Sequence, residues 1–293
     1  TLFRSEFQSR ICHDAPSDYP FKPYHILALM TLFHIFIISV VQGLTEFLPI
    51  SSSGHLVLVP AFLGLPDQGL IMDLAAHIGS LLAVLVYYRR DVWKISLACL
   101  HWNATEDKQS RNLGVFIVLA TIPAVIAGFV MHKIIPDGIR DVRVITATTI
   151  FFAILMGLAD RFGAKDRALN GMTLKSAAVV GFAQMIALIP GTSRSGITIT
   201  AGRFLGFNRV DAARFSFLLS IPATAGAGML GMLDVIESGN TALGIDMLLA
   251  IVMTFFAALA AISFMMRWLK NFGLMPFVIY RIFLGAILIM FFN

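Results

Sequence analysis

Six stretches of this chain are apolar over lengths that a soluble domain does not need. A helix that crosses a bilayer needs about 20 mostly apolar residues. The stretches that meet or approach this length are 70–88, 113–135, 143–158, 212–233, 245–266 and 274–292. Charged residues make up only 13% of the chain, whereas soluble domains carry about 25%. The sequence therefore predicts an all-α polytopic membrane protein whose main solvent is lipid.

Two further apolar regions, 26–66 and 174–207, are interrupted near their centres by Pro, Gly and Ser. The first break is LPISSSGH at 48–55, and the second is IPGTSRSG at 189–196. Irregular backbone at membrane depth is tolerated only where protein or a water-filled cavity surrounds it. We therefore predict that each region forms a re-entrant helical hairpin, which enters the membrane and does not cross it.

The two broken regions are also similar in sequence. With a shift of 142 residues, seven of the 24 positions from 42 to 65 are identical, among them Gln42 with Gln184 and Ser51 with Ser193. Three spans follow each copy, and an odd number of crossings places the second copy upside down. The sequence thus predicts an inverted repeat, in which each half is one re-entrant hairpin plus three transmembrane helices. Repeat 1 covers about 26–158 and repeat 2 about 174–292, within a single membrane domain at 25–293.

Residues 1–24 are polar and contain three prolines, so we expect a tail outside the membrane domain. The tail does not have the basic, apolar and small-residue regions of a signal peptide in that order. The two cysteines, Cys12 and Cys99, are far apart and neither is near a His at metal-ligand spacing. We therefore expect no disulfide framework and no zinc site.

The net charge of +5 comes from Lys and Arg in short loops, which is a topology signal and does not indicate a nucleic-acid partner. Thirteen Lys and Arg residues fall on the side of the 89–112 and 159–175 loops, and six fall on the other side. The positive-inside rule places those two loops in the cytoplasm and both termini outside. The first hairpin then enters from the outer face and the second from the inner face.

Ionisable side chains inside a membrane cost about 2.5–3.5 kcal/mol each on insertion scales, so each needs a partner or a function. The apolar regions contain Glu46, His55, Asp73, His77, Arg194, Arg203 and Arg281. For Asp73, His77 and Arg281 we expect a structural role, with either of the first two pairing with Arg281. Arg203 is expected to extend along the helix toward the cytoplasmic interface.

The remaining three ionisable residues fall in or beside the two breaks. Glu46 lies one helical turn after Gln42, so both side chains share a face. In the first break, Ser51, Ser52, Ser53 and Gly54 open the exiting helix just before His55. A helix start offers free N–H groups and a positive dipole end, which together form an anion site.

The second break places Arg194 among four small or hydroxylated residues, Thr192, Ser193, Ser195 and Gly196. A guanidinium group can hold two phosphate oxygens at once. Together the two breaks predict a pyrophosphate cradle with two helix starts, an arginine clamp, hydroxyl groups, one His and one carboxylate. For Ser51 and Ser193 an equally open alternative is close helix packing, which Ser and Gly commonly serve in membranes.

The segment QGLTEFLPISSSGH at 42–55 resembles the first signature of the undecaprenyl-diphosphate phosphatases, the bacitracin-resistance family, and PGTSRSG at 190–196 resembles the second. The resemblance runs from about residue 26 to the C-terminus. It implies hydrolysis of undecaprenyl pyrophosphate to undecaprenyl phosphate, which recycles the lipid carrier of peptidoglycan synthesis. It also implies a divalent cation, Mg²⁺ or Ca²⁺, and a bacterial inner-membrane location with the active site facing the periplasm. A homodimer is one of the assemblies that the sequence leaves open.

By position, Glu46, Ser52, His55 and Arg194 match the essential residues of that family, and Glu46 is the expected metal ligand. Gln42 stands where many members have Glu, and a neutral amide cannot act as a base, so Glu46 supplies the carboxylate alone or shares that role with another residue such as Asp73. The resemblance then suggests that Arg194 binds the pyrophosphate, that Ser52 or a nearby water attacks phosphorus, and that His55 relays the proton.

Three other functions are compatible with parts of this sequence. A polyprenyl-phosphate transporter or flippase could use the same inverted-repeat architecture, although the catalytic set argues against transport alone. The phosphatidic-acid phosphatase superfamily also uses a Ser-Gly-His segment, but Thr200 stands where that family has its second His. A membrane scaffold without enzymatic activity is the third alternative.

Overall fold

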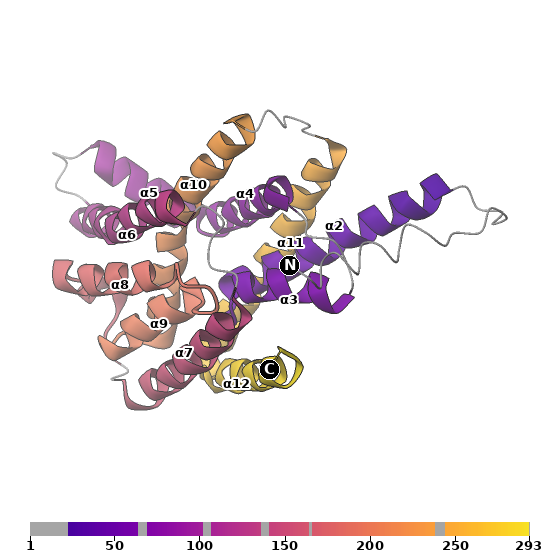
Figure 1. Ribbon diagram of the computed structural model, residues 1–293. Coiled ribbons are helices and arrows are strands. Elements are labelled where there is room, and N and C mark those ends of the chain that lie inside the picture. Colours follow the sequence, from indigo (N-terminus) through magenta and orange to yellow (C-terminus); the bar gives the residue numbers. More distant parts are fainter. Residues whose placement is uncertain are drawn as a thin grey trace. The chain divides into compact units, whose positions relative to one another are not determined.

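The computed structural model describes residues 23–63, 69–101, 107–135, 141–163, 166–237 and 244–292 (Figure 1). The described residues form helices, turns and one isolated bridge between Arg167 and Phe207, with no strand among them. The prediction of an all-α membrane protein is thus confirmed, while residues 1–22 of the predicted tail lie outside the described part. The chain divides into the units 1–34 and 35–293, and the features below belong to the second unit.

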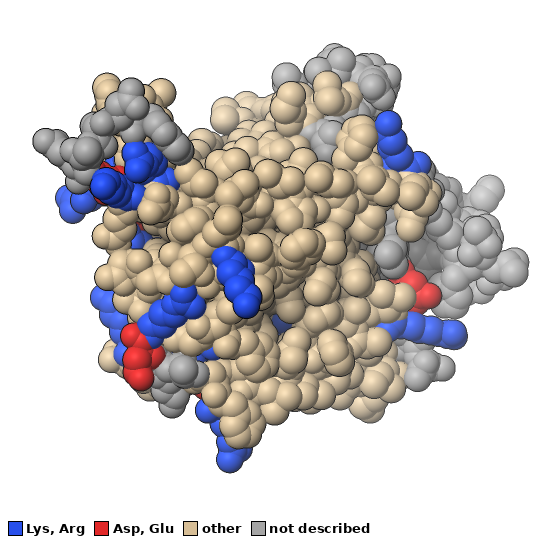
Figure 2. Space-filling view, turned by 90° about the vertical axis from the view of Figure 1, so that its left-hand side faces the viewer, with Lys and Arg blue, Asp and Glu red and all other residues tan. Residues whose placement is uncertain are grey.

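Each of the six predicted spans is a helix. They are α4 (Gly69–Tyr87), α6 (Lys108–Ile134), α7 (Val142–Phe162), α10 (Arg209–Glu237), α11 (Ile245–Asn271) and α12 (Met275–Phe292). Four of them, α6, α7, α10 and α11, contain stretches long and apolar enough to cross a membrane, and α4 and α12 provide shorter apolar helices. Large apolar side chains such as Val118, Ile126 and Phe256 are exposed on them. Figure 2 shows one face of the molecule, which is mostly uncharged and carries scattered charged side chains, more of them Lys and Arg than Asp and Glu.

Both interrupted regions fold as helix, loop and helix, as expected. The first consists of α2 (Pro23–Phe47) and α3 (Ser52–Leu63), and the second of α8 (Leu174–Ile186) and α9 (Arg194–Phe204). The 13 residues of α8 rise only about 20 Å, less than the bilayer core of about 30 Å. A half-length helix such as α8 suits a hairpin that does not cross, whereas α2 has 25 residues, and the re-entry and the inverted orientation remain predictions.

The two loops share an unusual backbone conformation. Ser51 (φ 77°) and Ser193 (φ 70°) are the non-glycine residues with positive φ in the described ranges, and the 142-residue shift superposes one on the other. Each of the two serines is the N-cap of the following helix. Ser51 Oγ accepts a hydrogen bond from Gly54 N at 3.4 Å, and Ser193 Oγ accepts one from Gly196 N at 3.2 Å. A left-handed non-glycine residue is strained, and such strain persists where the surroundings fix it. The sequence repeat is therefore a repeat of local structure as well.

Close approaches of small residues hold the helices of the two repeats against their neighbours. A Cβ added at Gly43 of α2 would lie 2.6 Å from Ala257 Cβ of α11, and one at Gly181 of α8 would lie 2.6 Å from the Ala120 carbonyl oxygen of α6. Helices in lipid associate through such packing, because burial of apolar surface gives little drive there. The pairs α2–α11 and α8–α6 occupy equivalent places in the repeat.

One helix was not predicted. The segment 89–112 was expected to be a cytoplasmic loop, but Arg89–Leu100 forms α5, none of whose side chains is buried. Its start is strongly charged, and it exposes Trp93 and Leu100. The prediction rested on uninterrupted apolar length, and this criterion does not detect a short amphipathic helix.

Arg203 has an ion-pair partner that the sequence did not indicate. Its side chain is fully buried (0% exposed), donates to the Phe207 carbonyl at 2.6 Å and lies 3.5 Å from the Asp160 carboxylate. Arg209 donates to both oxygens of the same carboxylate, at 2.6 and 3.0 Å. Arg203 is therefore neutralised by Asp160 of α7, 43 residues away in sequence, and its extension toward the cytoplasmic interface remains a prediction.

Candidate functional site

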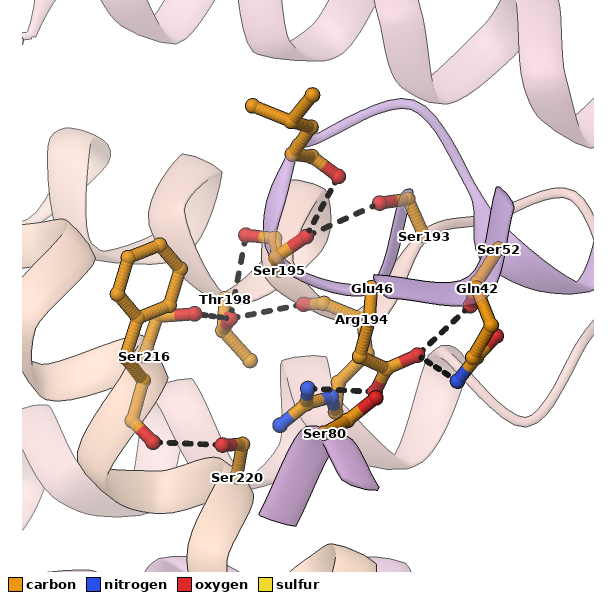
Figure 3. A network of polar contacts seen from close by, with 12 residues as sticks. Gln42, Glu46, Ser52, Ser80, Ser193, Arg194, Ser195, Thr198, Ser216 and Ser220 are labelled. Carbon is orange, nitrogen blue, oxygen red and sulfur yellow. Dashed lines mark hydrogen bonds and ion pairs between the residues drawn. The ribbon is translucent and has the colours of Figure 1, made fainter. Parts of the chain in front are cut away.

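The two broken regions meet at the Glu46 carboxylate, in the last turn of α2 (Figure 3). Arg194 Nη2 donates to Oε1 at 2.8 Å, and Ser52 Oγ and Gln42 Nε2 donate to Oε2 at 2.9 and 3.1 Å. The side chain of Glu46 is only 9% exposed. A buried carboxylate with one cation and two hydrogen-bond donors is compensated as a charged group.

Ser52 and Arg194 occupy equivalent places in the repeat. They are the first residues of α3 and α9, and the 142-residue shift superposes them. Both helix starts, with their free N–H groups, therefore approach one carboxylate. The equivalent of Glu46 is Leu188, so the second repeat contributes no second acid and the site is asymmetric.

The two loops also contact each other directly. Ser195 Oγ donates to the Leu48 carbonyl at 3.1 Å and lies 3.4 Å from Ser193 Oγ. Ser195 is 1% exposed. This contact fixes the second loop against the first at the point where both chains turn.

Side chains from α7 and α12 hold the second loop from its other side. Thr149 Oγ1 donates to the Gly191 carbonyl at 3.3 Å. Arg281 Nη2 donates to the carbonyls of Gly191 and Thr192 at 2.8 and 3.0 Å. Arg281 thus has a structural role as expected, but it binds loop carbonyls and not Asp73 or His77.

His55 lies one turn into α3, and both of its ring nitrogens are engaged. Nδ1 is 2.7 Å from the Ser51 carbonyl, and Nε2 is 2.6 Å from the Tyr280 hydroxyl. Because a carbonyl can only accept, Nδ1 carries a proton, and in the neutral ring Nε2 therefore accepts from the Tyr280 hydroxyl. The predicted nucleophile, Ser52, donates its hydrogen bond to the Glu46 carboxylate at 2.9 Å.

Several buried polar atoms at this site have no hydrogen-bond partner in the described part of the chain. They are Arg194 Nη1, Gln42 Oε1 and Thr192 Oγ1. Arg281 Nη1 is likewise unpaired and lies 3.0 Å from the position of a Cβ built on Gly196, near the start of α9. Buried polar groups are nearly always satisfied, so unpaired ones beside two helix starts are typical of a site that takes a polar ligand.

The structure brings most of the predicted site residues together. Those in or directly beside the paired loops are Gln42, Glu46, Ser51, Ser52, Gly54, His55, Thr192, Ser193, Arg194, Ser195 and Gly196. The prediction for the Ser53 side chain lies outside the described residues. The sequence did not indicate Thr149 or Tyr280 as site residues, because each contact spans a long stretch of chain and neither residue is ionisable at neutral pH.

The donor set for a metal ion is small. Within the described ranges no group of three or more His, Cys, Asp and Glu side chains is arranged around a common point. The oxygen donors present are the Glu46 carboxylate and the unpaired Gln42 Oε1. Mg²⁺ commonly binds through one or two protein oxygens together with substrate phosphates and water, so this set fits a cation that arrives with its substrate.

Comparison with known proteins agrees with the geometry. The family model described as bacitracin resistance protein BacA matches residues 35–287. An undecaprenyl-diphosphatase of Alteromonas mediterranea is 45% identical over 263 residues, covering 89% of this chain and 99% of its own. Proteins with the same name from Roseobacter denitrificans and Idiomarina loihiensis are 46% and 45% identical, covering 89% and 87% of this chain and 99% and 97% of their own. The chain belongs to the BacA family of bacitracin resistance proteins.

Proposed function

We propose that this protein is an undecaprenyl-diphosphate phosphatase, which hydrolyses undecaprenyl pyrophosphate to undecaprenyl phosphate and inorganic phosphate. The observation that carries the proposal is the Ser52 hydroxyl, which donates to the buried Glu46 carboxylate between two helix starts and beside Arg194. A nucleophile bonded to its base, next to an anion site, is the arrangement that phosphoryl transfer needs. The name of the relatives, which align over nearly their whole length, supports the same substrate.

In the proposed reaction Ser52 Oγ attacks the terminal phosphorus, and Glu46 accepts the hydroxyl proton. The bond from that phosphorus to the bridging oxygen breaks, and undecaprenyl phosphate leaves. Water then hydrolyses the phosphoserine and regenerates Ser52. Arg194 Nη1 and the N–H groups at the starts of α3 and α9 bind the phosphate oxygens and stabilise their charge.

The contacts of His55 suggest a different role from proton relay. Its ring links the Ser51 carbonyl of the first loop to the Tyr280 hydroxyl of α12. We therefore assign it to positioning the start of α3, and with it Ser52. Glu46 takes the place of the proton acceptor, because it is the group that the Ser52 hydroxyl contacts.

We further propose that Glu46 and Gln42 hold a divalent cation, Mg²⁺ or Ca²⁺, when the substrate binds. A bound cation supplies Lewis-acid stabilisation of phosphate charge. The unpaired Gln42 Oε1 supports this assignment, since it is a buried acceptor next to the only carboxylate of the constellation in the described chain. The Glu46 ligand would exchange part of its contact with Arg194 for the cation.

The multi-pass membrane fold suits a lipid substrate and the bilayer as its surroundings. We propose that the protein lies in the bacterial inner membrane with the site facing the periplasm. The support is the distribution of Lys and Arg, which favours the cytoplasm for the 89–112 and 159–175 loops.

The test is phosphate release from undecaprenyl pyrophosphate by detergent-purified protein, with and without EDTA, beside an Arg194→Ala variant whose thermal unfolding midpoint shows that it is folded. We expect release by the wild type, loss of release with EDTA, recovery on adding Mg²⁺ or Ca²⁺, and little release by the variant. Release that is insensitive to EDTA would reject the cation. No release by folded wild type with the metal restored would reject the phosphatase and favour a polyprenyl-phosphate transporter of the same architecture.

A further inference from the structure

A groove lies between α4 and α10, outside the polar site. It has a volume of about 460 Å³, within the usual range of about 300–1,000 Å³ for ligand pockets. Leu81 contributes to its wall from α4, and Met229, Met232 and Leu233 contribute from α10. The two methionines adapt readily to an irregular hydrocarbon surface. The groove therefore suits a flexible apolar chain and offers almost nothing to a polar ligand.

Helix α4 connects the groove to the polar site. His77, one of the two polar side chains in the wall, lines the groove from α4. Its Nδ1 donates to the Asp73 carbonyl at 2.7 Å, which fixes the ring on its helix. Ser80, one turn further along α4, is drawn beside Glu46 and Arg194 in Figure 3. The same helix thus borders both the polar site and the groove.

Helix α10, which forms the second wall of the groove, also reaches the polar site. Ser220 of α10 belongs to the polar cluster of Figure 3, and Thr224, the other polar residue of the groove wall, lies one turn beyond it. From Thr224 to Leu233 the helix rises about 14 Å. The groove therefore begins level with the polar site and leads away from it along α10.

We propose that this groove binds the first part of the polyprenyl chain of the substrate while the pyrophosphate lies at Glu46 and Arg194. The assignment rests on the proposed function, since it names the place of the substrate's tail. A headgroup held at a buried polar site requires its hydrocarbon chain to leave through an apolar passage, because polar side chains in lipid are costly. The groove provides such a passage, and its walls offer the chain apolar contacts on two sides.

Gly228 allows a direct test, because it lines the groove and has space around it. A Cβ built there meets only Leu74 Cδ1, at 3.8 Å, which is an ordinary contact. Gly228→Leu would therefore fill the groove without a backbone clash, and it replaces a helical glycine by a better helix former. Ala227→Leu is the matched control, since Ala227 is exposed on the same helix and does not line the groove.

The experiment measures kcat/KM at one detergent concentration for prenyl pyrophosphates of five, fifteen and fifty-five carbons. We expect kcat/KM of the wild type to rise with chain length. Gly228→Leu should lower it about tenfold for the longest substrate and less than twofold for the shortest. Ala227→Leu should follow the wild type on all three.

Other results would overturn the assignment. A wild-type kcat/KM that is independent of chain length, or a Gly228→Leu variant that matches wild type on the longest substrate, would show that the groove does not bind the substrate's tail. An equal loss on all three substrates would show that the change acts on the polar site. If the wild type hydrolyses none of them, the proposed function itself fails, and the tail assignment fails with it.

Discussion

At the scale of single residues, Glu46 determines how the site can be tested. It is the shared acceptor of Arg194, Ser52 and Gln42. Removing one partner of a buried ion pair costs about 3–5 kcal/mol, because the other charge is left uncompensated. A change at Glu46 would therefore confuse lost chemistry with lost folding. Ser52→Ala and Arg194→Lys leave both charges of the ion pair in place, so they separate the two effects.

Ser52→Ala removes the proposed nucleophile and leaves the Glu46–Arg194 ion pair in place. We expect kcat to fall by a factor of about 10²–10⁴, with little change in the thermal unfolding midpoint. Ser39→Ala is the control, since Ser39 is a buried serine of α2 that donates to the Ala250 carbonyl at 3.4 Å. It should keep most of the activity. A Ser52→Ala enzyme with more than half of the wild-type kcat would assign the attack to water.

Arg194→Lys tests whether the guanidinium acts through two separate donors. In the structure Nη2 binds Glu46 and Nη1 is left unpaired. A lysine can keep the ion pair but cannot present a second, rigidly placed N–H to phosphate. We expect kcat/KM to fall about 10²-fold or more, with the protein still folded.

The control for this change is Arg214→Lys. Arg214 donates to both oxygens of Asp91, at 3.1 and 2.8 Å, in an ion pair outside the site. The Arg214→Lys variant should lose little phosphatase activity. If Arg194→Lys retains wild-type kcat/KM, the arginine serves only as the counter-charge of Glu46.

At the scale of structural elements, the second loop is a strained turn held on several sides. Gly191 has φ 87°, and its carbonyl accepts hydrogen bonds from Thr149 and Arg281. A Cβ built on Gly191 would lie 2.2 Å from Thr148 Oγ1 and 2.5 Å from the Ile145 carbonyl oxygen. Only glycine fits this position, since both the backbone angle and the space exclude a side chain. The precision of the site therefore depends on how closely the loop approaches α7.

Gly191→Ala should destabilise the protein by at least about 2 kcal/mol, through the left-handed conformation and the collision with α7. Phosphate release should fall with it, because Arg194 starts the helix that follows the loop. The measurement is the thermal unfolding midpoint in detergent beside Gly226→Ala, where the nearest atom to a built Cβ is Val125 Cγ2 at 4.0 Å. An unchanged midpoint for Gly191→Ala would mean that the loop is free to move away from α7.

The elements also show which parts of the structure could be predicted from sequence. Apolar length located six helices, and the Pro, Gly and Ser breaks located both loops, because each signal is local in the chain. The charged helix α5 was missed, because its pattern is short and amphipathic. The partners of Arg203, Arg281 and His55 could not be derived either, since each pairing joins residues brought together only by packing.

For the whole molecule, the repeat explains why the site lies where two halves of the chain meet. Ser52 and Arg194 begin equivalent helices, and both donate to one acid that only the first repeat supplies. Duplication thus gives two helix starts, and divergence at Leu188 and Arg194 turns a symmetric pair into one asymmetric site. This account predicts that the two halves have opposite orientations in the membrane, since each half contributes three spans.

Cysteines placed at equivalent helix ends test that orientation. Lys133 and Lys270 are exposed in the last turns of α6 and α11, which are matching elements of the two repeats. With Cys12 and Cys99 replaced, a membrane-impermeant maleimide added to intact spheroplasts should label Lys133→Cys and not Lys270→Cys. Both should react once the membrane is permeabilised, which controls for accessibility. Labelling of both variants in intact spheroplasts would reject the inverted repeat. Labelling of Lys270→Cys alone would keep the inversion, but it would reverse the membrane orientation inferred from the Lys and Arg distribution.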